Sequence, residues 1–161
     1  MLKIIAAHDN EFLIGNKNKL PWNIKEDIEH FHKEIEGKVI LMGRITYESI
    51  KNIKNNFKVK KIIVMTKNLN YDPKDSDILI FHKIIDVLQY SEKEDIYICG
   101  GSEIYEQLLP YTKEMIITEI KGIYEGDSYF PLYDNKEFKL IKEKKLSDQA
   151  IVKYLSRIKK K

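Results

Sequence analysis

The sequence contains a single cysteine, Cys99, and this scarcity excludes two kinds of small protein. One thiol cannot form an internal disulfide, and it cannot supply the several ligands of a cysteine-rich zinc site. The chain also lacks an apolar run long enough to cross a bilayer, and its first apolar run is too short for a signal peptide. We therefore expect a protein of the reducing cytoplasm, without membrane attachment or a metal site.

Excess charge is scarce as well, because 28 lysine and arginine residues face 25 aspartate and glutamate residues, leaving a net charge of +3. So small an excess does not indicate nucleic-acid binding. The 161 residues are 43% hydrophobic and 33% charged, which is typical of one globular domain with a sizeable core. We expect a single domain over residues 1–161.

Short apolar runs alternate with helical patterns along most of the chain. Strands are predicted over 2–7, 39–42, 62–65, 78–81 and 96–99, and helices over 24–35, 43–50, 84–90 and 104–109. After Pro110 the pattern changes, and strands without intervening helices are predicted over 115–120, 138–143 and 151–158. This order predicts an α/β fold with a central, mostly parallel sheet, helices on both faces and a C-terminal antiparallel hairpin. Residues 51–61 are predicted to be the least regular segment.

The helix predicted after Pro21 carries a carboxylate on its apolar face. That face consists of Ile24, Ile28, Phe31 and Ile35, and Asp27 lies among them. An unpaired ionised carboxylate against a core costs about several kcal/mol unless it is neutralised or finds a partner. Asp27 is thus a candidate ligand-binding group. The alternative is that it only serves the helix dipole, which favours acids in a first turn.

Two predicted strands run directly into glycine and the start of a helix. The first junction is Gly-Arg-Ile-Thr at 43–46, and the second is Gly-Gly-Ser at 100–102. The unpaired N–H groups at a helix start favour phosphate, and Arg44 could bind it bidentately. One such junction is often only a packing feature. Two at the carboxyl edge of one sheet could bind both sides of a pyrophosphate. Neither matches GxGxxG, so we expect a dinucleotide bound in another α/β manner.

Several short motifs, taken in order, resemble the dihydrofolate reductase family. They are Ile5-Ala6-Ala7, Ile14-Gly15, Leu20-Pro21-Trp22 with Asp27 and Phe31, Met42-Gly43-Arg44 with Thr46, Ser49 and Ile50, Gly100-Gly101 with Ile104-Tyr105, Thr118, and Glu125-Gly126-Asp127 with Phe130-Pro131. The match extends over nearly the whole chain. It implies a dihydrofolate-reductase-like fold with an adenosine-binding subdomain roughly over 38–92.

The resemblance implies reduction of 7,8-dihydrofolate to tetrahydrofolate by hydride transfer from NADPH, and binding of antifolates. Asp27 would bind the pterin and promote protonation of its N5, Thr118 would hydrogen-bond that carboxylate, and Trp22 would hold a water at the pterin edge. Desolvation should raise the pKa of Asp27, which suits a group that relays a proton near neutral pH. The implied catalytic residues are Asp27, Trp22, Tyr105 and Thr118, and the implied substrate-binding residues are Ile5, Ala7, Asp27, Ile28, Phe31, Ile50, Cys99, Tyr105 and Thr118.

The resemblance also implies a set of NADPH-binding residues. They comprise Ala7, Ile14, Gly15 and Tyr105 for the nicotinamide, Gly43, Arg44 and Thr46 for the phosphates, Thr66 and Lys67 for the adenosine ribose, and Gly100, Gly101, Ser102 and Ile104 at the second junction. A cis peptide bond is implied between Gly100 and Gly101. The loop from about 10 to 19 would close over the reacting rings, and Asp127 would brace it.

The sequence departs from the family at the substrate tail. The arginine that usually grips the glutamate carboxylate aligns with Val59. Lys58 or Lys60 could substitute, but an ammonium lacks the fork that matches a carboxylate. Our hypothesis is that the tail is held more loosely. His30 and His32 flank Phe31 and are expected to be rim residues without a chemical role.

A second departure concerns the cofactor. Ile45 stands where a basic residue often helps to bind the 2′-phosphate, and Glu103 adds a negative charge nearby. Arg44, Lys67 and His82 remain as positive partners, so NADPH is still the expected cofactor.

Two alternatives stay open from the sequence. A riboflavin-pathway pyrimidine reductase of similar fold would have the glycine junctions, but would not require Trp22, Asp27 and Thr118 together. A nucleic-acid-binding module would explain the many lysines. It is disfavoured by the even charge balance and by the lack of an aromatic platform among basic residues.

Overall fold

The computed structural model describes residues 1–158, which form ten strands, four α-helices and two 3₁₀ helices. In chain order the elements are β1 (Leu2–His8), β2 (Leu13–Gly15), α1 (Lys25–Ile35), β3 (Val39–Gly43), α2 (Arg44–Ile50), η1 (Lys51–Asn56), β4 (Lys61–Met65), β5 (Ile78–Phe81), α3 (Ile84–Ser91), β6 (Ile96–Ile98), α4 (Ser102–Leu108), η2 (Leu109–Tyr111), β7 (Glu114–Ile120), β8 (Ser128–Tyr129), β9 (Phe138–Ser147) and β10 (Ala150–Arg157). Over this range no helix has the length and apolar character needed to span a membrane.

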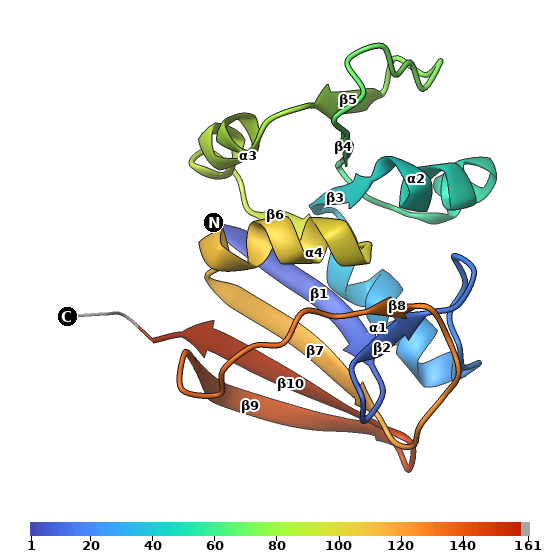
Figure 1. The fold of residues 1–161 in the computed structure, drawn as a ribbon, viewed down its shortest axis with the longest axis vertical. Helices are drawn as coiled ribbons and strands as arrows, with labels where there is room; N and C mark the ends of the chain where they lie inside the picture. Colours follow the sequence, from blue (N-terminus) through green and yellow to red (C-terminus); the bar gives the residue numbers. More distant parts are fainter. Residues whose placement is uncertain (159–161) are drawn as a thin grey trace.

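Eight strands form one sheet in the order β5-β4-β3-β6-β1-β7-β10-β9 (Figure 1). All neighbouring pairs from β5 to β7 are parallel, whereas β10 runs antiparallel to both β7 and β9. The predicted mostly parallel sheet with a C-terminal antiparallel hairpin is therefore confirmed. β2 and β8 form a separate two-stranded ribbon.

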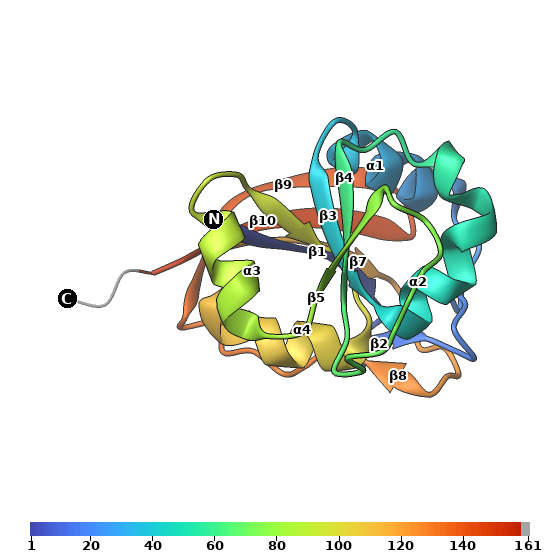
Figure 2. The same ribbon diagram turned by 90° about the horizontal axis from the view of Figure 1, so that it is seen from above.

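Helices cover both faces of the sheet. Val87 of α3 and Leu108 of α4 pack in one apolar cluster, and Ile35 of α1 and Tyr47 of α2 pack in another. Figure 2 shows α1 on the opposite side of the strands from α3 and α4. All five residues of β3 are buried, as expected for a parallel strand that is covered on both faces. This burial on both faces explains why the central strands appear in the sequence as unbroken apolar runs.

Apart from shifts of one or two residues at the ends of other elements, the structure differs from the predicted elements in three places. β2 and β8 were not predicted, because strands of three and two residues show no measurable periodicity. η1 begins the segment 51–61 that was predicted to be irregular. β9 continues to Ser147, beyond the predicted end at Glu143, because it is a largely exposed edge strand held by pairing with β10.

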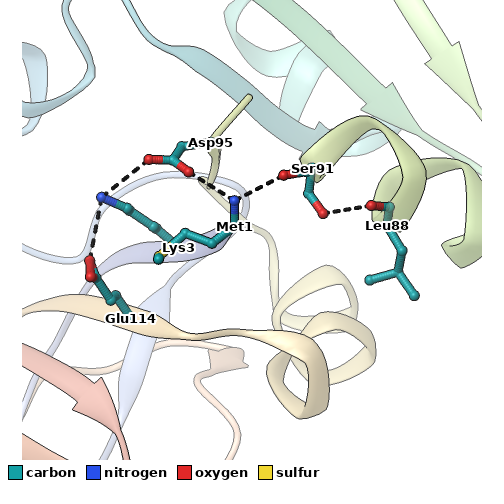
Figure 3. Close-up of polar contacts among 6 residues, drawn as sticks. All are labelled: Met1, Lys3, Leu88, Ser91, Asp95 and Glu114. Atoms are coloured by element: carbon teal, nitrogen blue, oxygen red, sulfur yellow. Dashed lines mark hydrogen bonds and ion pairs between the residues drawn. The ribbon is translucent and has the colours of Figure 1, made fainter. Parts of the chain in front are cut away.

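A polar network ties the amino ends of the central strands together (Figure 3). The amino nitrogen of Met1 donates to the carbonyl oxygen of Ser91 at 2.9 Å and to Asp95 Oδ1 at 2.8 Å. Lys3 Nζ lies 3.5 Å from Asp95 Oδ2 and 3.3 Å from Glu114 Oε2. The network connects the starts of β1, β6 and β7 with the last turn of α3.

Candidate active site

Two adjoining cavities open at the opposite, carboxyl ends of these strands. One, of about 420 Å³, lies between β1, α1 and α4, and the other, of about 850 Å³, lies against the starts of α2 and α4. Five residues line both cavities: Asn18, Thr46, Gly101, Ser102 and Ser128. The carboxyl edge of a parallel sheet is where α/β proteins bind their ligands. We call the smaller one the substrate cavity and the larger one the cofactor cavity.

Asp27 lies in the first turn of α1 and lines the substrate cavity, with only 5% of its surface exposed. Trp22 Nε1 donates a hydrogen bond of 3.1 Å to its Oδ2. Among the described residues no lysine, arginine or histidine forms an ion pair with it. Burial raises the pKa of the Asp27 carboxyl, and the hydrogen bond from Trp22 opposes this rise. The predicted rise in pKa is thus confirmed in direction and cause.

The walls of the substrate cavity are mostly apolar. Predicted substrate residues that line it are Ile5, Ala7, Ile28, Phe31, Ile50, Cys99, Tyr105 and Thr118. Ile28 lies on the predicted apolar face of α1 but is 39% exposed, because that part of the face borders the cavity instead of the core. Burial raises the pKa of the Cys99 thiol, so Cys99 serves as an apolar wall and stays protonated at neutral pH.

Two predicted contacts of Asp27 differ in the structure. Thr118 is buried in β7 and lines the cavity, but no hydrogen bond joins it to Asp27. The prediction that Thr118 orients the carboxylate was therefore wrong for this structure, and Trp22 takes that role. Trp22 is itself 6% exposed and does not line either cavity. Its indole N–H bonds the carboxylate directly, where the resemblance had implied a water.

Tyr105 joins α4 to the central strand. Its hydroxyl donates to the carbonyl oxygen of Ile5 at 2.8 Å, and its ring packs against Phe130 with centroids 4.9 Å apart. Burial raises the pKa of Tyr105 well above its ordinary value, so the hydroxyl remains a donor at neutral pH. Tyr105 therefore fixes the distance between β1 and the second glycine junction.

The two glycine junctions lie side by side. The Gly43 N–H donates to the carbonyl oxygen of Gly100 at 2.9 Å, and the Gly100–Gly101 peptide bond is cis, as the resemblance implied. Gly43, Arg44, Thr46, Thr66, Lys67, Gly101, Ser102 and Ile104 line the cofactor cavity, and Ala7, Ile14, Gly15, Gly100 and Tyr105 line the substrate cavity. Every predicted site residue except Trp22 thus lines one of the two cavities.

Cationic side chains predominate in the cofactor cavity. Arg44, Lys67 and Lys83 line it, against one carboxylate, Glu103. His82 also lines it, and its Nδ1 donates to the carbonyl oxygen of Thr66 at 2.8 Å. Lys83 was not singled out from the sequence, although its position just after a predicted strand could have indicated it.

The loop before α1 is held by the turn before β8. The Asp127 N–H donates to the carbonyl oxygen of Gly15 at 3.0 Å, and the Lys17 N–H donates to Asp127 Oδ2 at 3.2 Å. The structure therefore places Asp127 against the loop that it was predicted to brace.

Comparison with known proteins agrees with this geometry. A sequence model described as dihydrofolate reductase matches residues 1–159. The chain is 35% identical over 159 residues to the dihydrofolate reductase of Mycoplasma pneumoniae, covering 96% of this chain and 97% of that one. It is 36% identical over 153 residues to that of Buchnera aphidicola, covering 94% and 90%. The chain belongs to the dihydrofolate reductase family.

A solved structure shares the fold of this dihydrofolate reductase family member. Dihydrofolate reductase from Enterococcus faecalis, complexed with NADP(H) and RAB-propyl, superposes with a TM-score of 0.85 at 25% identity. The superposition covers 98% of this chain and 96% of that one. The dihydrofolate-reductase-like fold predicted from the sequence is therefore confirmed.

The segment expected to hold the substrate tail places no guanidinium at the substrate cavity. Val59 packs, half-buried, in the apolar cluster that also contains Phe31 and Phe57. Lys60 forms an ion pair with Glu94. No arginine, and neither Lys58 nor Lys60, is among the residues that line the substrate cavity. Phe31, His32 and Phe57 line the cavity instead.

One of the two histidines predicted to be rim residues differs from expectation. His32 lines the cavity and stacks on Phe57, with ring centroids 5.0 Å apart and planes inclined by 19°. His30 is buried, so it is not the rim residue that was predicted, and its Nε2 has no hydrogen-bond partner among the described residues. Phe57 itself was missed, because it lies in a lysine-rich segment without periodicity.

Proposed function

We propose that this chain reduces 7,8-dihydrofolate to 5,6,7,8-tetrahydrofolate with NADPH, and that Asp27 assists protonation of the pterin N5. The single observation that carries the proposal is a buried carboxylate with no cationic partner among the described residues, inside an apolar cavity that adjoins paired glycine junctions. The family assignment replaces both alternatives raised from the sequence. Tetrahydrofolate formed in this way would supply one-carbon metabolism and thymidylate synthesis.

The cofactor cavity fits a dinucleotide with a 2′-phosphate. Both glycine junctions line the cavity, and each glycine lets a side chain of the other junction pack closely, because a Cβ on Gly43 would lie 3.0 Å from Ile104 and one on Gly101 would lie 3.3 Å from Thr46 Oγ1. Arg44, Lys67 and Lys83 supply positive charge for phosphates. When bound, NADPH supplies the hydride.

The residues around the substrate cavity would bind the pterin, orient the carboxylate and exclude water. Asp27 would bind the polar edge of the pterin and hold a proton at its carboxyl group, because burial has raised its pKa. The Trp22 indole would orient the carboxylate through Oδ2. The apolar walls exclude water, so that hydride transfer depends on alignment of the two rings.

The finer expectations stay predictions. They are an adenosine-binding subdomain over 38–92, a monomeric state, a cytoplasmic location, binding of antifolates and no binding of nucleic acid.

The decisive experiment compares wild type with Asp27→Asn. We expect NADPH oxidation that depends on dihydrofolate, and a loss of hydride-transfer rate of about 10²–10³-fold at neutral pH in the variant, as for removal of a general acid. The loss should be partly recovered with a substrate already protonated at N5. The matched control is Glu29→Gln, on the exposed side of the same helix, which should keep the wild-type rate. Absence of turnover in the wild type would overturn the function, and full activity of Asp27→Asn would overturn the role of that residue.

A further inference from the structure

Asp9 is a second buried carboxylate near the site, and the mechanism above does not use it. It follows β1 directly and is 1% exposed. Three main-chain N–H groups donate to it: Glu11 and Leu13 to Oδ1 at 2.8 and 3.0 Å, and Tyr124 to Oδ2 at 2.8 Å. Within the described residues it forms no ion pair. A single side chain therefore joins two segments that are distant in sequence.

The first segment is the base of the loop that borders both cavities. Besides the two bonds to Oδ1, the Asp9 N–H donates to the Leu13 carbonyl oxygen and the Phe12 N–H donates to that of Asp9, both at 3.1 Å. Phe12 has a φ of +66°, a conformation that persists in a bulky residue only where the surroundings hold it. The chain leaves this turn directly into Ile14 and Gly15, which line the substrate cavity.

The second segment leads to the catalytic carboxylate. The Tyr124 ring contacts the Trp22 indole edge to face, with centroids 5.5 Å apart and an interplanar angle of 68°. The same indole donates its N–H to Asp27 Oδ2. The contacts thus run from Asp9 through Tyr124 and Trp22 to Asp27.

We propose that Asp9, at the base of the loop, is a positioning residue of the reaction. It holds Tyr124 against Trp22, and Trp22 in turn fixes the orientation of the Asp27 carboxylate. The inference rests on the proposed role of Asp27. Asparagine at this position keeps one acceptor oxygen, but its NH₂ group cannot accept, so the variant leaves at least one main-chain N–H without an acceptor. Asp9→Asn therefore tests the link with almost no change in side-chain volume.

The first readout is independent of activity. Trp22 is the only tryptophan in the chain, so intrinsic fluorescence reports on this residue alone. In Asp9→Asn we expect emission shifted to the red and quenching by acrylamide increased, under conditions where circular dichroism shows the variant folded. Emission and quenching identical to wild type would overturn the proposal.

The second readout is the pH dependence of hydride transfer. The hydrogen bond from Trp22 lowers the pKa of Asp27 against the effect of burial. Loss of that bond should move the apparent pKa of the pH–rate profile upward. We expect this shift in both Asp9→Asn and Trp22→Phe, with no further shift in the double variant, and a fall in rate of about tenfold while the KM for NADPH stays within about twofold. A wild-type profile in Asp9→Asn, or shifts that add in the double variant, would contradict the link.

Other titratable groups around the same cavity remain unchanged in these variants. They are Lys19 in the loop before α1, His30 and His32 on α1, Cys99 after β6 and Tyr105 on α4. Asp134→Asn is the matched control, since this exposed aspartate accepts one main-chain N–H, that of Lys136 at 2.8 Å, in a surface turn. It should leave both readouts at their wild-type values.

A further variant covers the case in which Asp9→Asn does not fold. Tyr124→Leu leaves the Asp9 side chain intact and removes only the ring that contacts Trp22, so it should reproduce the fluorescence change and the shift in profile. A fluorescence change in Asp9→Asn or Tyr124→Leu, together with an unaltered pH–rate profile in Trp22→Phe, would overturn the proposed role of Asp27. A shifted profile in Trp22→Phe with wild-type profiles in Asp9→Asn and Tyr124→Leu would overturn the positioning role of Asp9.

Discussion

Charged groups are paired with one another at one end of the parallel strands, and within the part of the chain that the structure describes key charged groups are left unpaired at the other end. At the amino ends, the amino group of Met1, Lys3, Asp95 and Glu114 lie within 3.5 Å of an opposite charge. At the carboxyl ends, Asp27 and the cations of the cofactor cavity form no ion pair with other described residues. Charges that bind a ligand must stay without a protein partner, whereas charges that connect elements can neutralise one another. Stability and function are therefore divided between opposite ends of the same sheet.

Among the substitutions that test this comparison by ligand affinity or stability, the largest effect should follow from a side chain added at the carboxyl end. Gly100 has a φ of +111°, and a Cβ there would lie 3.4 Å from the Tyr105 ring. Gly100→Ala would carry backbone strain of about 1–3 kcal/mol. Since Gly100 also accepts the Gly43 N–H, relief of that strain would move both junctions. We expect the Kd for NADPH to rise about 10- to 100-fold in a fluorescence titration.

A glycine at the amino end provides the matched comparison. Gly37 has a φ of +72° before β3, and a Cβ there would meet no atom of the described residues 1–158 within 4 Å. Gly37→Ala should lower the free energy of unfolding through the same kind of strain and leave the Kd for NADPH unchanged. An equal loss of NADPH affinity in Gly100→Ala and Gly37→Ala would show that the strain acts through global stability. Stability and ligand binding would then not be divided between the two ends of the sheet.

The second prediction concerns the stability cost of Asp27. Because burial raises the pKa of this group in the folded state, folding is favoured at acidic pH, and that contribution is lost as the pH rises through the raised pKa. Asp27→Asn should therefore be more stable than wild type at pH 7. Each gain of about 1 kcal/mol would raise the Tm by about 2–4 °C. Thermal unfolding from pH 5 to 8 should show the gain increasing with pH.

Asp95 supplies the opposite case at the amino end. The hydrogen bond from the Met1 amino group and the nearby Lys3 lower its pKa, so its contribution is present at neutral pH and is lost as the pH falls through the lowered pKa. Asp95→Asn should be less stable at pH 7, by under about 1 kcal/mol, since this side chain is 48% exposed. Changes of the same sign in the stability of Asp27→Asn and Asp95→Asn at pH 7 would contradict the comparison between the two ends.

Much of the fold could be predicted because its central strands are buried on both faces. β1, β3 and β4 appear as apolar runs, and the glycine junctions follow two of the predicted strands directly. β2 and β8 could not be found, since their pairing depends on a contact between Leu13 and Tyr129 from distant parts of the chain. Periodicity reports one element at a time and carries no information on such pairing.

The site was predictable as a set of residues and less so as a set of contacts. Motif order placed nearly all its members at the cavities, but the bond from Trp22 to Asp27, in place of one from Thr118, depends on side-chain conformation. Asp9 was missed for a related reason. One of its donors, the N–H of Tyr124, is 115 positions away, and main-chain donors have no signature in the residue type.

The smallest expected effect is that of the substrate's glutamate tail. Lys60 is engaged with Glu94, and Val59 is packed in an apolar cluster, so no guanidinium is placed to grip a carboxylate beside the aromatic pair of His32 and Phe57. We expect kcat/KM for dihydropteroate, which lacks the glutamate, to lie within about threefold of that for dihydrofolate, since an exposed ion pair contributes under about 1 kcal/mol. A preference of 100-fold or more for dihydrofolate in the wild type would refute this expectation.

Val59→Arg tests the same argument in the other direction. A guanidinium that reached the tail would bind its carboxylate bidentately and raise the preference for dihydrofolate about tenfold. Lys60→Ala is the control, because it removes a neighbouring positive charge that the structure pairs with Glu94 and should leave the ratio unchanged. If Lys60→Ala instead lowered the ratio, the lysine would serve the tail, and its charge would belong to the ligand-binding part of the molecule. The separation of paired charges at the amino ends from ligand-binding charges at the carboxyl ends would then fail at Lys60, just before β4.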